Sequence, residues 1–203
     1  MNYRLIGFFG LVSVLLFCSG FTGLFIINPQ AIQEINNVCI TYFNLLDMEG
    51  RLWISSLGYI ASGVAGIIYF GALLFKVVST SRKIALWILV LHSVLWISFG
   101  VIPYNHLSDS SNLLMLNRTL IDLFLILSGL LIISSEGLTS DHLGPIRLSS
   151  IVSASLIGIL CFMSVFVFND STWIRSNLCY LIYHLWIGVS GLTLLIRRTP
   201  NIA

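Results

Sequence analysis

The chain has 203 residues, of which 57% are hydrophobic and only 9% are charged, and its formal net charge is +2. Soluble domains carry about 25% charged residues, so this composition excludes an ordinary water-soluble domain. The basic residues are scattered, which also argues against a nucleic-acid partner. Uncharged apolar runs of about 20 residues can cross the hydrocarbon core as helices, and the sequence therefore predicts an all-α polytopic membrane protein.

Six such runs follow one another along the chain, and we expect residues 1–203 to form a single transmembrane domain. The predicted membrane-spanning helices cover residues 5–27, 52–75, 84–103, 113–134, 148–168 and 176–196.

Lysine and arginine in the short connecting segments predict the orientation, because these residues gather on the cytoplasmic side. An inward amino terminus places Arg51 and Arg175 outside. The larger set then lies on the cytoplasmic side: Arg4, Lys76, Arg82, Lys83, Arg147, Arg197 and Arg198. We therefore expect both termini in the cytoplasm and a location in the inner (cytoplasmic) membrane.

The longest connecting segment, residues 28–50, has apolar residues at helical spacing with polar residues between them. This pattern predicts a short amphipathic helix at the outer interface. The segment contains Cys39, and Cys179 belongs to the same outer side. A disulfide between these two cysteines is one expectation for an oxidising compartment.

The second span is rich in small residues. Gly58, Ser62 and Gly66 lie four residues apart and share one helix face, which lets another backbone approach closely. We expect this face to pack tightly inside the bundle. The alternative is a groove for a lipid or another ligand.

Several polar and ionisable residues lie within the predicted spans: His92 in the third, Asn117, Arg118 and Asp122 in the fourth, and His184 in the sixth. A charge at the centre of a membrane helix costs about 2.5–3.5 kcal/mol, so these side chains should point inward and meet in one pocket that opens toward the outer face. Arg118 is also close enough to pair with Asp122 in its own helix. The group forms either a structural ion pair with two hydrogen-bonded histidines or a proton-responsive site.

The histidines of the chain raise two other chemistries, a haem and a metal site. A b-type haem needs an axial histidine from each of two helices, and His92 and His184 lie at matching depth. A metal site has less support, because His106 and Asp109 stand alone on a short outer segment with no zinc-ligand pattern. We expect no metal.

Aromatic residues gather toward the outer ends of the spans, as in the aromatic belts that anchor membrane proteins. They are Trp53, Tyr59, Tyr104, Trp173 and Tyr180.

Residues Trp53-Ile54-Ser55-Ser56-Leu57-Gly58 resemble a motif of a prokaryotic six-span membrane family known as domain of unknown function 998, which is distantly similar to Frag1/DRAM-type proteins. Members typically read Ile-Ser-Asp-Leu-Gly there, followed by a small-residue helix and a third span that ends near a proline and a histidine. Pro103 and His106 match that order, whereas Ser56 replaces the aspartate. The resemblance covers roughly residues 50 to 135. It implies the six-helix layout and no activity.

Three classes of function follow from these observations. The favoured class is a membrane binding or accessory protein that holds a lipid or small amphiphile, or docks on other membrane subunits. The alternatives are a small proton-coupled transporter that uses the intramembrane Arg, Asp and His residues, and a membrane enzyme or haem electron carrier. An enzyme is the less favoured class, because no nucleophile elbow or nucleotide fingerprint occurs.

Overall fold

The computed structural model describes residues 2–27, 52–101, 109–136, 144–166 and 172–196, and the regular structure of these residues is α-helical. The helices are α1 (Tyr3–Ile27), α4 (Leu52–Leu74), α5 (Thr80–Val101), α6 (Asp109–Glu136), α7 (Gly144–Phe166) and α8 (Thr172–Ile196). Each coincides with one predicted span. Most begin up to one turn before the apolar run, because polar residues such as Thr80 and Asp109 favour the first positions of a helix. The predicted amphipathic helix at 28–50 lies outside the described residues.

Four helices contain an apolar stretch that is long enough to cross a membrane. These stretches are Thr80–Ser98, Thr119–Glu136, Ile146–Met163 and Leu178–Ile196. Within the described residues, α1 and α4 contribute shorter apolar segments, Tyr3–Ser19 and Ile60–Leu74. The prediction of a helical membrane protein is therefore confirmed by length and composition, and the count of six crossings stays a prediction.

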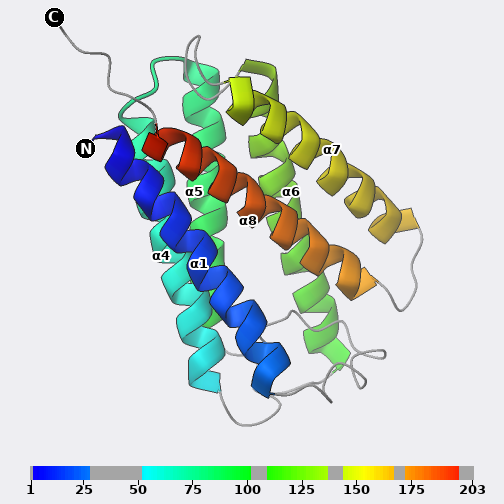
Figure 1. Cartoon of the computed structure of the whole chain (residues 1–203). Coiled ribbons are helices and arrows are strands. Elements are labelled where there is room, and N and C mark those ends of the chain that lie inside the picture. Colours follow the sequence, from blue (N-terminus) through cyan, green and yellow to red (C-terminus); the bar gives the residue numbers. More distant parts are fainter. Residues whose placement is uncertain (1, 28–51, 102–108, 137–143, 167–171, 197–203) are drawn as a thin grey trace, which may run out of the picture.

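The helices form a closed ring in which neighbours in sequence are neighbours in space. Helix α4 packs on α1 and α5, α6 on α5 and α7, and α8 on α7 and α1, with a further contact between α6 and α8. The beginning of α1 and the end of α8 lie at the same end of the bundle (Figure 1). Consecutive helices run antiparallel to one another (Figure 1), as in up-and-down helix bundles.

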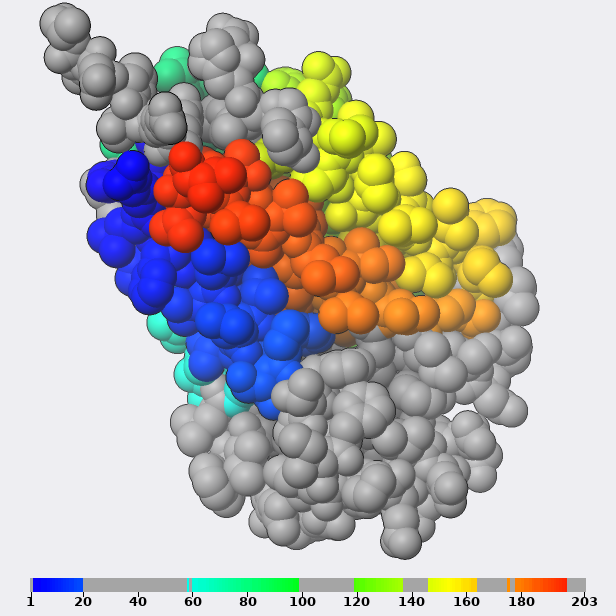
Figure 2. Space-filling model, in the orientation of Figure 1, coloured from blue at the N-terminus to red at the C-terminus, as the bar shows by residue number. Residues whose placement is uncertain are grey.

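The polarity of the bundle suits a lipid solvent. Large apolar side chains face outward on every helix, including Leu15, Trp87, Phe124, Phe162 and Leu185, each of which is more than half exposed. Figure 2 shows one outer face, on which α1, α8 and α7 lie next to each other. Soluble monomers rarely expose apolar patches larger than a few hundred Å², so this outer surface is expected to contact acyl chains.

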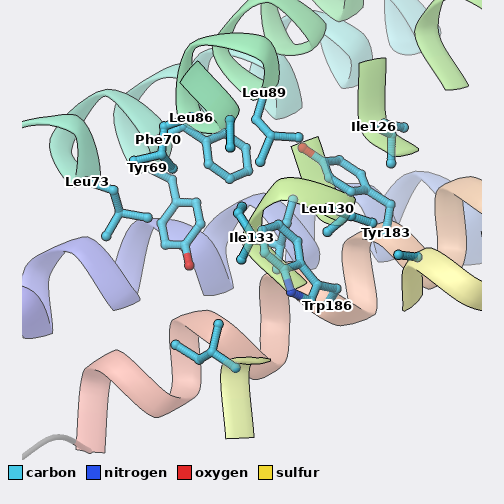
Figure 3. Packing of buried hydrophobic residues seen from close by; sticks show 14 of the residues in the cluster. Tyr69, Phe70, Leu73, Leu86, Leu89, Ile126, Leu130, Ile133, Tyr183 and Trp186 are labelled. Atoms are coloured by element: carbon cyan, nitrogen blue, oxygen red, sulfur yellow. The ribbon is translucent and has the colours of Figure 1, made fainter. Parts of the chain in front are cut away.

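The interior contains a core of aromatic side chains from α4 and α8 (Figure 3). Phe70 stacks on Trp186 with ring centroids 6.2 Å apart, and Trp186 stacks on Tyr183 at 6.0 Å. The hydroxyl of Tyr69 donates a hydrogen bond of 2.7 Å to Ser190 Oγ. A buried hydroxyl needs such a partner because it leaves water behind.

Two glycines let the first and last helices approach closely. A Cβ on Gly7 would collide with the carbonyl oxygen of Gly191, and a Cβ on Gly191 would lie 2.9 Å from the carbonyl oxygen of Gly7. This is the close packing that small residues permit between membrane helices. It closes the ring by bringing α1 against α8.

Polar side chains of other segments contact the last residues of α6, on the side of the bundle where α1 begins. Arg82 Nη2 donates to the carbonyl oxygen of Glu136 at 2.8 Å, and Ser79 Oγ donates to Glu136 Oε2 at 2.8 Å. Arg147 Nε donates to the carbonyl oxygen of Ser134 at 3.2 Å. The last carbonyls of a helix lack intrahelical donors, and the two arginines supply donors to two of them.

Candidate functional site

The most polar contact in the interior joins His92 of α5 to Asp122 of α6. His92 Nδ1 lies 2.5 Å from Asp122 Oδ1. Both side chains are almost fully buried, with exposed fractions of 3% and 0%. When Asp122 is ionised, the Nδ1–H of His92 donates to its carboxylate. Burying a carboxylate requires a donor of this kind, so the pair explains how an acidic residue is accommodated at this depth.

Only one oxygen of Asp122 has a hydrogen-bond partner among the described residues. Its second oxygen, Oδ2, is buried and has no hydrogen-bond partner among the described residues. The hydroxyl of Tyr183 is likewise buried without a partner in that part of the chain. The ring of Tyr183 packs edge-on against His92 with centroids 4.8 Å apart. Two buried polar groups with free capacity therefore flank the same histidine.

His184 lies on α8 on the other side of Tyr183, with ring centroids 5.4 Å apart. Its Nδ1 lies 2.8 Å from the carbonyl oxygen of Tyr180, and its Nε2 lies 3.5 Å from Ser62 Oγ. Because a carbonyl only accepts, Nδ1 must carry the proton, and the Nε2 of a neutral ring then accepts from the serine hydroxyl. Phe17 of α1 stacks on the His184 ring at 3.8 Å. Helices α1, α4 and α8 thus hold this imidazole in one orientation.

Tyr180 was predicted to belong to an outer aromatic belt, and that prediction is wrong. Its side chain is only 2% exposed, and its ring packs against Trp96 with centroids 4.7 Å apart. Trp96 also lies 5.6 Å from His92 and 6.2 Å from His184. An aromatic wall therefore surrounds both histidines. The sequence places Tyr180 one turn before His184, so its face on α8 follows from helical spacing.

A small cavity lies between the two histidines. It has a volume of about 10 Å³, counted as the space open to the centre of a water molecule. About 10–15 Å³ on this measure holds one water, provided that polar partners are present. The lining supplies them, since it consists of Ser13, Ser62, Gly63, Gly66, His92, Ser93, Trp96, Tyr183, His184 and Ile187. The cavity can therefore accommodate one hydrogen-bonded water.

Two members of the predicted small-residue face, Ser62 and Gly66, border this cavity, whereas Gly58 is half-buried and does not line it. A Cβ on Gly66 would lie 2.5 Å from Ser93 Oγ on α5. The face thus serves tight packing of α4 on α5 at the point where the polar interior begins.

The structure brings together three of the predicted site residues, His92, Asp122 and His184, in one connected cluster. Arg118 and Asn117 lie on α6, but their side chains are outside the described part of the chain. The ion pair between Arg118 and Asp122 stays a prediction for this reason, as does the opening of the pocket toward the outer face.

Sequence reasoning missed the side chains that join these groups. Trp96 lies one turn after His92 on α5, so helical spacing could have found it. Tyr183 is the sequence neighbour of His184. Ser13 and Phe17 come from α1, and nothing in their spacing relates them to residues on α8.

The two histidines, as placed here, do not fit the axial pair of a haem. The Nε2 of His184 that would bind iron faces the Ser62 hydroxyl. The cavity between the histidines measures about 10 Å³, whereas ligand and cofactor sites are typically about 300–1,000 Å³. No group of three His, Cys, Asp or Glu side chains that could hold a metal ion occurs among the described residues.

Cys179, one half of the predicted disulfide, is a free and fully buried thiol in hydrogen-bonding contact with Cys161 of α7. Its predicted partner, Cys39, lies outside the described residues. The sequence predicts that Cys179 belongs to the outer side, but it does not predict that the thiol lies between α7 and α8.

Comparison of the chain with protein-family models, with curated proteins and with solved structures finds no match. The resemblance to the family of domain of unknown function 998 therefore stays a prediction, and function must be argued from the site.

Proposed function

We propose that the protein binds and releases a proton at the His92–Asp122 pair within the membrane, as a small proton-coupled carrier. The observation that carries this proposal is a buried imidazole–carboxylate contact of 2.5 Å whose second carboxylate oxygen has no partner among the described residues. Ionisable residues within membrane helices typically mark ion or proton pathways. Histidine suits this role because its ordinary pKa lies near neutral pH.

The neighbouring groups support a short relay for the proton. The water-sized cavity is lined by His92, Ser62 and His184, and Ser62 Oγ lies 3.5 Å from His184 Nε2. Hydroxyl groups and water both donate and accept hydrogen bonds, so either can pass a proton onward. In this scheme Asp122 holds the charge, His92 exchanges the proton, and His184 keeps a fixed orientation beside them.

The first test is direct titration of the purified full chain in detergent. Trp96 lies 5.6 Å from His92, and protonation of a nearby imidazole quenches indole fluorescence. We expect a sigmoidal change in fluorescence with pH that disappears in Asp122→Asn. Glu136→Gln is the matched control, because it removes a carboxylate from the far end of the same helix and should leave the titration unchanged. An identical titration in Asp122→Asn would refute the proposal.

A second measurement separates a carrier from a static buried pair. The full chain is reconstituted in liposomes that contain a pH-sensitive dye, and a potassium gradient with valinomycin sets the membrane potential. We expect proton flux above that of empty liposomes in the parent protein and in Glu136→Gln, and none in Asp122→Asn. A purely structural pair can often be replaced by apolar residues without loss of stability. The double variant His92→Phe, Asp122→Leu should therefore fold, and flux through it would contradict the proposal.

The orientation of the chain is part of the same proposal. In Figure 1 the beginnings of α1, α5 and α7 and the ends of α4, α6 and α8 share one end of the bundle. We propose that this end faces the cytoplasm, because Arg4, Lys76, Arg82, Lys83 and Arg147 all lie there. Tags at both termini should then be protected from an external protease in intact cells of a bacterial host, and cleavage of either tag would contradict this orientation.

A membrane binding or accessory protein is the second candidate. The cavity between the two histidines accommodates only a water, so an amphiphile held by the described residues has to lie on the outside of the bundle. One observation favours this candidate, namely a groove along the outer face of α4.

A further inference from the structure

The outer face of α4 carries a groove that is separate from the interior site. Its volume is about 380 Å³, which lies within the range of about 300–1,000 Å³ found for ligand sites. The groove is lined by Ile67, Ile68, Gly71, Ala72, Phe75 and Lys76. These positions repeat along one face of the helix, opposite the face that carries Ser62 and Tyr69 into the core.

The wall of the groove is apolar and is notched in its middle. A Cβ on Gly71 would have no heavy atom within 4 Å, so the missing side chain leaves open space. From Ile67 to Lys76 the groove follows nine residue steps, or about 14 Å at 1.5 Å per residue. An apolar trough of this shape along a membrane helix matches a stretch of one extended acyl chain.

A cation lies at one end of this trough. Lys76 lies two residues after the last residue of α4 and is exposed, and its Nζ lies 5.8 Å from the centroid of the Tyr3 ring. Arg4 and Lys83 belong to the same end of the bundle and are also exposed. Phe75, next to Lys76, is 91% exposed, as expected of an aromatic residue at the level of lipid headgroups. The charge at this end is complementary to an anionic headgroup rather than to a zwitterionic one.

We propose that the α4 groove binds one acyl chain of an anionic phospholipid whose phosphate pairs with Lys76. The occupant is a lipid of the leaflet at the basic end of the bundle. The site deepens the second candidate function by naming its ligand. It shares no residue with the His92–Asp122 site, so the two proposals can fail separately.

Native mass spectrometry of the full chain in detergent tests the lipid site. The protein is mixed with equal amounts of phosphatidylglycerol and phosphatidylcholine that carry the same acyl chains. We expect a preference for phosphatidylglycerol that falls about fivefold in Lys76→Gln, the change expected for one basic side chain near an anionic surface. Lys83→Gln is the matched control, because it removes an exposed cation at the same end that does not line the groove.

A second variant tests the acyl-chain half of the site. A Cβ at residue 71 meets no heavy atom within 4 Å, so we expect Gly71→Phe to fold normally, to fill the notch and to retain neither lipid. Equal losses in Lys76→Gln and Lys83→Gln would mean that the charge acts diffusely and would overturn the headgroup assignment. Unchanged lipid retention in Gly71→Phe, with native helix content by circular dichroism, would overturn the groove. Lipid that is retained in Asp122→Asn would show that lipid binding in the α4 groove does not depend on the His92–Asp122 pair.

Discussion

The contact between α1 and α8 makes the substitution Gly7→Ala informative. The added Cβ would collide with the carbonyl oxygen of Gly191 and lie 2.7 Å from the backbone nitrogen of Leu195. Both neighbours are backbone atoms, so neither can move aside without separating the two helices. Overpacking of this kind costs about 1–3 kcal/mol. We expect this cost to appear as a lower free energy of unfolding relative to a glycine-to-alanine change that meets no collision.

The matched control lies in the same interface. A Cβ on Gly188 would meet Val14 Cγ2 at 3.5 Å, an ordinary van der Waals contact. Alanine is favoured over glycine in a helix by about 1 kcal/mol, and this gain applies to both variants. The difference between Gly7→Ala and Gly188→Ala therefore isolates the collision.

Unfolding by a denaturing detergent in mixed micelles, followed by tryptophan fluorescence, measures this difference. Gly188→Ala should be at least as stable as the parent protein, and Gly7→Ala should be less stable than either. Equal stability of Gly7→Ala and Gly188→Ala would refute the close approach of α1 and α8, and with it the closure of the ring.

Further predictions concern hydrogen bonds elsewhere in the bundle. Tyr69→Phe removes the donor to Ser190 and should lower the free energy of unfolding by about 0.5–1.5 kcal/mol without changing proton flux, as the same micelle assay and the liposome assay would show. Arg82→Gln weakens the contact with Glu136, which is partly exposed, and should change the free energy of unfolding little, because solvent screens such pairs. A thermal-unfolding series over increasing salt should show a smaller salt dependence in that variant than in the parent protein.

Hydropathy and composition predict the helices well, because an apolar run of about 20 residues in lipid has few alternatives to an α-helix. The predicted spans at 52–75 and 84–103 correspond to α4, which ends at Leu74, and to α5, which begins at Thr80. The predicted boundaries differ mainly at the amino-terminal ends, where residues such as Thr80 add a polar first turn. Hydropathy does not predict the order of the helices around the ring. That order depends on contacts such as Gly7 with Gly191, which are far apart in sequence.

The sequence predicts which ionisable residues belong to the candidate site, but it does not predict which of them contact one another. The high cost of a mid-membrane charge indicates that Asp122 must find an interior partner. The sequence offered Arg118 as that partner because it lies one turn away on the same helix. The structure places His92 of α5 against Asp122, while the side chain of Arg118 lies outside the described part of the chain. A contact between two helices depends on their relative rotation, and neither charge nor spacing within one helix specifies it.

Helix α4 separates the two proposed sites, and its sequence explains how one helix can serve both. Its inner face carries Ser62 and Gly66 toward the polar interior, where small side chains leave room for a water rather than for a ligand. Its outer face carries Gly71 and Lys76 toward the lipid, where a missing side chain and an exposed cation leave room for an amphiphile. Small residues therefore have opposite consequences on the two faces. Inside the bundle, neighbouring helices occupy the space that the small side chains leave. On the outer face, a Cβ on Gly71 would have no heavy atom within 4 Å, and this open space is the basis of the proposed lipid site.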